Sequence, residues 1–361
     1  MLKKYVWTLA LLAGTISAKS TWDQFRDPLD GKLDVSEWAL ENAHGFLLFP
    51  ALITDPAIGN GGLLGAIFFH ETEEQKEERR RTNTATTISP SVSGIVGGGT
   101  NNGTQFFGAF HSGNWLNDGI RYEGGIFQGL INIDFYGAGD PVKMTADGFL
   151  TQHDLDIRIA NSNWFVNGGY KLSGGDLNFE GVGKTESRDA AFSYGLLYES
   201  LDNQFSPNNG IKARVKVSEH GSYAGGDHDF TRFNSYINAY QTLSDKWRVS
   251  GRVVATAVSE GAPAWELPFI DIRGIPAMRY QGEQVASAEV ELAYALNSRW
   301  ELIGFTGAGS AYNQGQDSEL QTIYGGGFRH LIARQLGLKW GIDIAQHKND
   351  TAVYLQFGSA W

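Results

Sequence analysis

The 361-residue sequence contains no cysteine and no stretch of eighteen consecutive apolar residues. Without thiols the protein forms no disulfide and offers no thiolate ligand to a metal or a haem. Without a long apolar run, no helix is expected to span a membrane. Basic residues are also scarce, because 29 lysines and arginines stand against 40 aspartates and glutamates. This acidic balance argues against nucleic acid as a partner.

Glycine and aromatic residues are plentiful. The chain has 46 glycines, and aromatics make up 12% of a sequence whose mean hydropathy is −0.27. This composition fits either a soluble β-protein or a membrane barrel whose strands are apolar on only one face. The length allows one large β-domain or two ordinary domains.

Residues 1–18 have the pattern of a secretory signal peptide. Lys3 and Lys4 precede the apolar run 6–13, and small residues lead to Ala18, after which cleavage is expected. Removing the two lysines lowers the basic count from 29 to 27, and 27 minus 40 gives a mature net charge of −13. The pattern therefore predicts an exported, acidic protein.

Residues 19–45 form a short N-terminal segment ahead of the first strand. The stretch from Asp30 to Glu37 resembles the second half of a calcium-binding loop. Arg26 and Pro28 stand where the first two ligands belong, and neither side chain can coordinate the ion. We therefore expect a turn followed by a short helix over residues 36–42, with no metal and no other cofactor.

Residues 46–361 are almost entirely strands and turns, and their apolar residues alternate with polar ones. Leu338, Trp340 and Ile342, for example, alternate with Lys339 and Gly341. Such period-two alternation predicts strands with one apolar and one polar face. In a soluble sandwich the apolar faces would form a core, whereas in a membrane barrel they would face lipid and the polar faces would line the lumen.

Counting these segments gives about sixteen strands, an even number as in bacterial single-chain barrels. They are expected near 46–54, 58–70, 87–99, 104–114, 120–135, 148–160, 164–176, 189–200, 210–220, 230–243, 247–258, 284–296, 299–311, 320–332, 336–346 and 351–361. With the C-terminus in the periplasm, loops 177–188, 219–229 and 312–319 fall outside. The charged run 71–81 then falls in the periplasm.

The connection between the eleventh and twelfth strands is a loop of more than twenty residues, a length that is usually functional. Its centre reads IRGIPAM, with Arg273 and Gly274. In the strand that follows, period-two alternation points Glu289 and Glu291 to the same face. Carboxylates placed in this way can bind an arginine through charge-assisted hydrogen bonds. Within the loop itself, Asp271 is the rival partner.

Two other stretches carry recognisable patterns. In the final segment TAVYLQFGSAW, the residues Val353, Leu355 and Phe357 are expected to share one face with Trp361. The turn 198–210 carries an Asp-Asn…Pro…Gly pattern, formed by Asp202, Asn203, Pro207 and Gly210.

Together these stretches resemble the BamA/TamA family of outer-membrane β-barrels, also called the bacterial surface antigen family. In that family an Arg-Gly-aromatic loop folds back into the barrel, and its arginine meets carboxylates on the inner wall. Ile275 replaces the usual aromatic here, and 305–309 lacks the family's aspartate. The resemblance implies that Arg273 and Gly274 form a loop–lumen motif; its candidate carboxylates are Glu289, Glu291 and Asp343. It also implies that Phe357 and Trp361 form the C-terminal barrel signal.

The resemblance implies a transmembrane antiparallel barrel in the bacterial outer membrane that assists protein insertion or translocation. Expected partners are outer-membrane lipid, lipopolysaccharide and the cell's barrel-assembly machinery. The segment 19–45 is too short to be the periplasmic domain that receives clients in assembly-factor members. Two alternatives therefore stay open: a passive or gated solute channel, and a structural surface-antigen barrel without transport activity.

Catalysis is not expected. No Gly-x-Ser-x-Gly nucleophile motif occurs. His220 and His228 flank a glycine-rich loop with Asp227 and Asp229, but a solvated loop is a simpler interpretation than a metal site.

An inward-facing basic row is expected at Lys212, Arg214 and Lys216. It would either bind anions in a pore or pair with carboxylates across a plugged lumen. Pairing is favoured in a chain this acidic; the candidate partners are Asp154, Asp156, Glu289 and Asp343.

Overall fold

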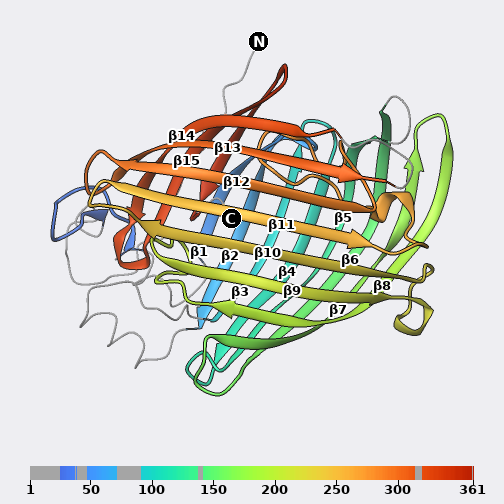
Figure 1. Cartoon of the computed structure of the whole chain (residues 1–361), viewed down its shortest axis with the longest axis horizontal. Helices are drawn as coiled ribbons and strands as arrows, with labels where there is room; N and C mark the ends of the chain where they lie inside the picture. The colour runs from blue at the N-terminus through green and yellow to red at the C-terminus, as the bar shows by residue number, and fades with distance from the viewer. Residues whose placement is uncertain are drawn as a thin grey trace, which may run out of the picture.

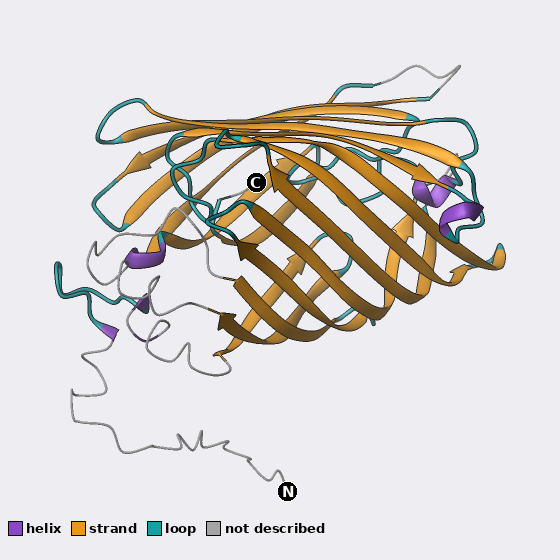
Figure 2. Ribbon diagram, turned by 90° about the horizontal axis from the view of Figure 1, so that it is seen from below, coloured by secondary structure: helices purple, strands orange, loops and turns teal. Residues whose placement is uncertain are grey.

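The computed structural model describes residues 25–36, 38, 47–70, 91–136, 141–313, 319–359 and 361. Sixteen antiparallel strands form a single sheet in which each strand pairs with its neighbours in sequence. The sheet curls into a barrel (Figure 1, Figure 2). This confirms the all-β barrel and its strand number. No helix in the described ranges is long and apolar enough to cross a membrane.

The strand bounds follow the expected segments closely. They are β1 (Leu47–Asp55), β2 (Gly59–His70), β3 (Ser91–Thr100), β4 (Gln105–Trp115), β5 (Ile120–Phe135), β6 (Val142–Arg158), β7 (Trp164–Phe179), β8 (Gly183–Glu199), β9 (Gly210–His220), β10 (Phe230–Thr242), β11 (Trp247–Val258), β12 (Gln284–Ala295), β13 (Trp300–Tyr312), β14 (Gln321–Ala333), β15 (Leu338–His347) and β16 (Asp350–Phe357).

Three expected boundaries are wrong. β6 begins at Val142, six residues before the expected start at 148. The predicted loop 177–188 is mostly strand, because β7 and β8 stay paired up to Phe179 and Gly183 and only three residues turn between them. The glycines and charged residues of this stretch are typical of a loop. A pair of strands that extends beyond the membrane into water can form without an apolar face, so the alternation that marks the other strands is missing here. The last strand also stops early, at Phe357 instead of 361. The run 71–81 lies outside the described residues.

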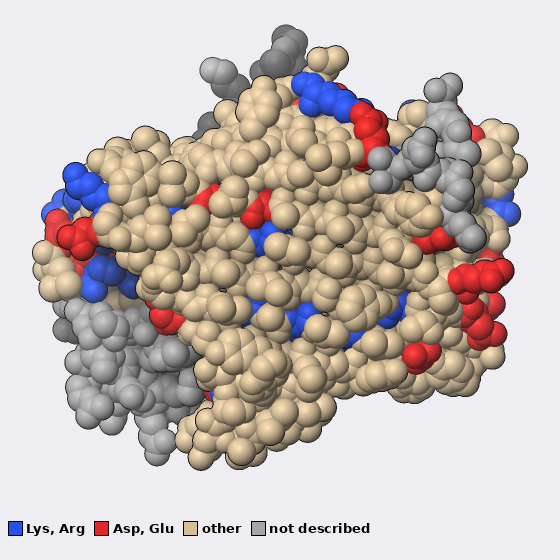
Figure 3. All heavy atoms as spheres, viewed as in Figure 1, with Lys and Arg blue, Asp and Glu red and all other residues tan. Residues whose placement is uncertain are grey.

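The strands are apolar on the outside and polar within. In β12, Glu289 and Glu291 are buried, whereas Val290 and Leu292 are 46% and 42% exposed on the opposite face. Such apolar outward faces are typical of a barrel that meets lipid. On the face shown in Figure 3, many charged side chains gather toward the two ends of the barrel and most of the surface between them is uncharged.

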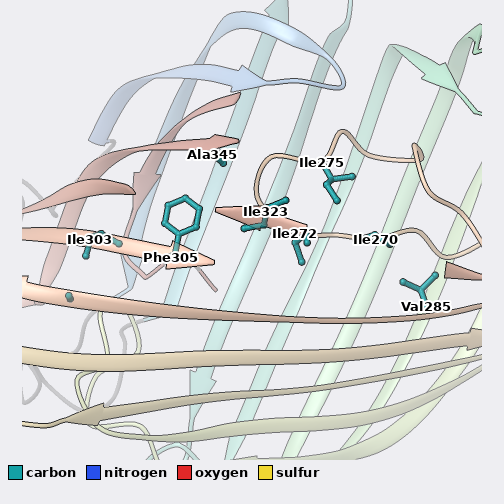
Figure 4. Packing of buried hydrophobic residues seen from close by; sticks show 9 residues of the cluster. Ile270, Ile272, Ile275, Val285, Ile303, Phe305, Ile323 and Ala345 are labelled. Atoms are coloured by element: carbon teal, nitrogen blue, oxygen red, sulfur yellow. The ribbon is translucent and has the colours of Figure 1, made fainter. Parts of the chain in front are cut away.

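We call the end where β1 begins and β16 ends the base, and the opposite end the rim. The connection 259–283, which joins β11 to β12 at the rim, packs on the inner wall (Figure 4). Ile270, Ile272 and Ile275 of this loop form a buried cluster with residues of β12–β15. The hydrophobic core therefore lies inside the barrel, on one side of the lumen.

The barrel closes where β1 lies beside β16, and we call this contact the seam. β1 and β16 are the two ends of the strand order, so no ladder joins them in the described sheet. Across the seam, the Leu355 backbone N–H donates to Thr54 Oγ1 at 3.2 Å. In the described sheet, the outer edges of β1 and β16 therefore have no ladder partner.

The described part of the N-terminal segment, residues 25–36 and 38, docks on the base. Arg26 and Leu33 form an isolated antiparallel bridge. The Val35 backbone N–H donates to the Ile332 carbonyl at 2.8 Å. Most of the helix expected over 36–42 lies outside the described residues.

Candidate functional site in the lumen

Loop 259–283 turns sharply at Gly274, and this position requires glycine. Its φ is +92°, a left-handed conformation that residues with a side chain rarely adopt. A Cβ there would also lie 3.1 Å from the Ala345 Cβ on the inner wall. The Gly274 backbone N–H donates to the Tyr354 hydroxyl on β16 at 2.8 Å. The turn thus brings the loop backbone directly against the barrel and aims Arg273 at the wall.

Arg273 meets three carboxylates on the inner wall. Its Nε lies 3.1 Å from Glu289 Oε1, and its Nη1 lies 2.9 Å from Glu291 Oε2 and 2.8 Å from Asp343 Oδ2. The arginine is 8% exposed and Asp343 is fully buried. All of these pairs are charge-assisted hydrogen bonds between buried side chains, and such bonds are about twice as strong as neutral ones. The structure therefore brings together the four charged residues that were predicted to form this motif.

The rival partner does not bind Arg273. Asp271 has an exposed side chain and lies 3.6 Å from Arg252 instead. The acid missing from 305–309 is also explained, because a Cβ at Gly307 would stand only 2.7 Å from Glu289 Cγ. Glu289 reaches over the position where another side chain would otherwise project. The carboxylates therefore come from β12 and β15 rather than from β13.

Arg329 on β14 is a member of this site that sequence reasoning missed. It is 2% exposed, and its Nη2 lies 2.9 Å from Asp343 Oδ2 and 3.8 Å from Glu291 Oε2. Three carboxylates thus share two guanidinium groups. The alternation along β14 could have identified it, since Arg329 is an even number of residues from the buried Gln321 and Ile323 and therefore lies on the same face.

Aromatic rings complete the surroundings of Arg273. Its guanidinium carbon lies 3.7 Å from the Phe305 ring centroid and 5.4 Å from that of Trp361. Contacts at this range are favourable because the ring face is electron-rich. The Trp361 indole N–H also donates to Glu289 Oε2 at 3.1 Å.

The placement of Trp361 corrects the expectation that it shares a face with Val353, Leu355 and Phe357. Phe357 is 54% exposed and stays on the outside. Gly358 then adopts φ +82° and redirects the chain, and the Ser359 N–H donates to the Phe205 carbonyl at 2.7 Å. Trp361 consequently enters the lumen, where its backbone carbonyl accepts from the Tyr240 hydroxyl at 3.2 Å.

The inward-facing basic row is fully paired. Lys212 Nζ lies 3.2 Å from Glu199, Arg214 Nη2 lies 2.7 Å from Asp156, and Lys216 contacts Asp154. Asp154 and Asp156 were expected partners and Glu199 was not. Glu289 and Asp343 serve Arg273 instead.

The His220 and His228 region does not form one cluster. His220 Nδ1 lies 2.6 Å from Asp189 Oδ1 on β8, and the ring of His228 contacts Trp265. Asp227 and Asp229 accept hydrogen bonds from backbone N–H groups. In the described residues, no group of three or more potential ligands could hold a metal ion.

A second ionic site joins the N-terminal segment to the base. The Arg299 guanidinium contacts Asp27, lies 2.8 Å from Asp30 and lies 2.6 Å from Asp34. Arg334 also binds Asp27, at 3.0 Å for its Nη2. The Arg299 hydrogen bonds lower the pKa of Asp30 to about 2, and the Arg334 hydrogen bond lowers the pKa of Asp27. The acidic stretch that resembled half a calcium loop thus surrounds a guanidinium group.

Comparisons with known proteins agree with this architecture. Residues 146–272 match the Omp85 superfamily domain. No curated protein sequence matches the chain. Among solved structures, the chain is similar to BamA from Haemophilus ducreyi lacking POTRA domains 1-3. The TM-score is 0.57 at 12% identity, covering 95% of this chain and 82% of that one.

Two further solved structures are similar. CdiB from Escherichia coli aligns with a TM-score of 0.60 at 13% identity, over 85% of this chain and 61% of that chain. CdiB from Acinetobacter baumannii aligns with a TM-score of 0.57 at 9% identity, over 87% and 59%. The chain therefore spans less than two thirds of both CdiB chains. At these identities, the similarity shows a shared barrel fold.

Proposed function

We propose, from the premise that this chain is a membrane β-barrel of the Omp85 superfamily, that it assists protein insertion or translocation at the bacterial outer membrane. The observation that carries the proposal is the seam. β1 and β16 lie side by side but share no ladder, so each offers backbone N–H and C=O groups to an incoming strand. A client strand would pair with such an edge by β-augmentation.

The lumen supports this proposal over a passive channel. Loop 259–283 fills one side of the lumen, and the triple pairing of Arg273 holds it there. The basic row that could have attracted anions is neutralised by its own carboxylates. The proposed activity therefore takes place at the seam and is not enzymatic. Outer-membrane lipid and lipopolysaccharide would surround the barrel, and the cell's barrel-assembly machinery would insert it.

A reversible lock on the seam tests the proposal. The chain has no native thiol, so Thr54→Cys with Leu355→Cys can join β1 to β16 by a disulfide. The matched control is Leu196→Cys with Val215→Cys, on two strands that are already paired. We expect the oxidised seam variant to fail to restore the outer-membrane proteome of a deletion strain, and reduction to rescue it. The control pair should restore that proteome in both states.

Full complementation by the oxidised seam variant would contradict the proposal. Conductance in planar bilayers separates the channel alternative. A steady ion current through the wild-type protein, together with an unchanged proteome in the deletion strain, would favour a channel instead.

A further inference from the structure

Part of the inner wall of β2–β6 is apolar, although a lumen that holds water is normally lined by polar residues. Along these strands, every second residue points outward. Outward-pointing residues such as Leu64, Phe107 and Ile126 are 57–63% exposed. The inner positions also carry large apolar side chains. We call this set the apolar wall: Leu63, Val96, Phe106, Phe127 and Leu150. A sheet that is apolar on both faces is typical of one covered on both faces.

A cavity of about 410 Å³ lies against the apolar wall. Phe106, Phe127 and Leu150 line it from the barrel, and Trp265 of loop 259–283 lines it from the lumen. Its floor has no side chains where Gly129, Gly148 and Gly175 stand opposite one another in register. Apolar walls around a bare backbone floor leave a space that water solvates poorly.

One end of this cavity is strongly polar. Asp189 and Glu266 both line it. Lys171 Nζ lies 2.9 Å from Asp189 and 3.7 Å from Glu266. Arg232 Nη2 lies 3.1 Å from Glu266, and His220 binds Asp189. An apolar cavity that ends at fixed charges of both signs has the shape of an amphipathic ligand, with hydrocarbon on one side and a polar group on the other.

The outer face behind the apolar wall is apolar as well. On the outer face of the same strands, Leu48, Leu64, Ile95, Phe107 and Ile126 surround a hollow of about 580 Å³. This hollow reaches β1, whose free edge is not joined to β16 by a ladder. The same part of the sheet is therefore apolar toward the lipid and toward the lumen, next to the seam. A bilayer supplies one apolar molecule beside this part of the barrel, the hydrocarbon chain of a lipid.

We infer that the cavity on the apolar wall holds a hydrocarbon chain of a membrane lipid. The polar part of the lipid lies toward Asp189, Lys171, Glu266 and Arg232. Trp265 lines the cavity from the loop side, so loop 259–283 has a second role besides presenting Arg273. The inference does not depend on the proposed function, because a barrel that inserts no client would bind lipid in the same place.

Photocrosslinking tests the inference with the intact wild-type protein. The protein is reconstituted in phosphatidylcholine vesicles that contain a small fraction of phosphatidylcholine with a diazirine in the middle of one acyl chain. After illumination, tandem mass spectrometry locates the crosslinks residue by residue. We expect adducts at the inner residues Phe106, Phe127 and Leu150, in addition to adducts at the outer residue Ile126.

A cavity-filling variant and its control make the test specific. Ala146 lines the cavity, so Ala146→Trp should remove the inner adducts and keep those at Ile126. Thr145→Trp places the same bulk on the opposite face of β6 and should keep both sets. Wild-type adducts confined to outward-facing residues would overturn the inference. Inner adducts that persist unchanged in Ala146→Trp would overturn the assignment to this cavity.

Discussion

At the scale of single residues, Arg273 has the largest predicted effect, because it is a buried cation shared by three buried carboxylates. Removing one partner of a buried ion pair typically costs about 3–5 kcal/mol, since the opposite charge is left stranded. We therefore expect Arg273→Ala to lower the temperature at which the folded barrel loses its altered gel mobility. Loop 259–283 should also become sensitive to protease in intact cells.

Arg279 provides the matched control for Arg273. It belongs to the same loop and pairs with Asp350, but the side chains are 27% and 50% exposed. Exposed pairs contribute about 0–1 kcal/mol. Arg279→Ala should therefore change gel mobility and protease sensitivity little. If Arg273→Ala changed gel mobility and protease sensitivity as little as Arg279→Ala, the buried ion pairs of Arg273 would not stabilise the barrel or the loop.

Arg299 is predicted to hold residues 25–38 against the base in a pH-dependent manner. Asp30 has its pKa lowered from 3.8 to about 2 in the folded state, mainly by its hydrogen bonds to Arg299. A lowered pKa means that the stabilisation is complete above pH 3.8 and is lost as the pH falls toward 2. Limited proteolysis of the segment should therefore be slow at pH 5–7 and should accelerate below about pH 4.

The same segment should be released at neutral pH in Arg299→Ala. Arg334→Ala is expected to be the milder change, because among the described aspartates the Arg334 side chain contacts Asp27, whereas Arg299 binds Asp27, Asp30 and Asp34. Cleavage should therefore rank wild type slowest, Arg334→Ala intermediate and Arg299→Ala fastest. A wild-type rate in Arg299→Ala would show that backbone contacts such as Val35 to Ile332 suffice.

At the scale of elements, β16 and the chain end that follows it have different roles. Phe357 ends the strand facing outward, and Trp361 lies in the lumen beside Arg273. Trp361→Phe keeps an aromatic ring but removes the indole N–H that donates a hydrogen bond to Glu289. We expect this variant to increase protease sensitivity of loop 259–283 while the amount of barrel in the membrane stays near wild type. Phe357→Ala should do the reverse, reducing membrane assembly and leaving the loop protected.

At the scale of the whole molecule, alternation predicted the sixteen strands because each strand has a lipid-facing and a lumen-facing side. The same periodicity placed Glu289 and Glu291 on one face, and the structure brings both to Arg273. The pattern fails where the decisive contact is remote or the backbone turns. Arg299 meets aspartates more than 260 residues away, and no local pattern reports such a contact. Trp361 leaves the strand because of one left-handed glycine, Gly358.

The orientation of the barrel is the remaining prediction at this scale. We predict that the base, where β1 begins and β16 ends, faces the periplasm and that the rim faces the outside. Val182 lies in the β7–β8 turn at the rim and is 77% exposed, and Leu243 lies in the β10–β11 turn at the base and is 59% exposed. Because the chain has no native thiol, Val182→Cys and Leu243→Cys each present a single reactive group. In intact cells a membrane-impermeant maleimide should label Val182→Cys and spare Leu243→Cys, since the reagent does not cross the outer membrane. Permeabilised cells should label both. Labelling of Leu243→Cys alone in intact cells would show that the barrel has the opposite orientation, with loop 259–283 entering the lumen from the periplasm.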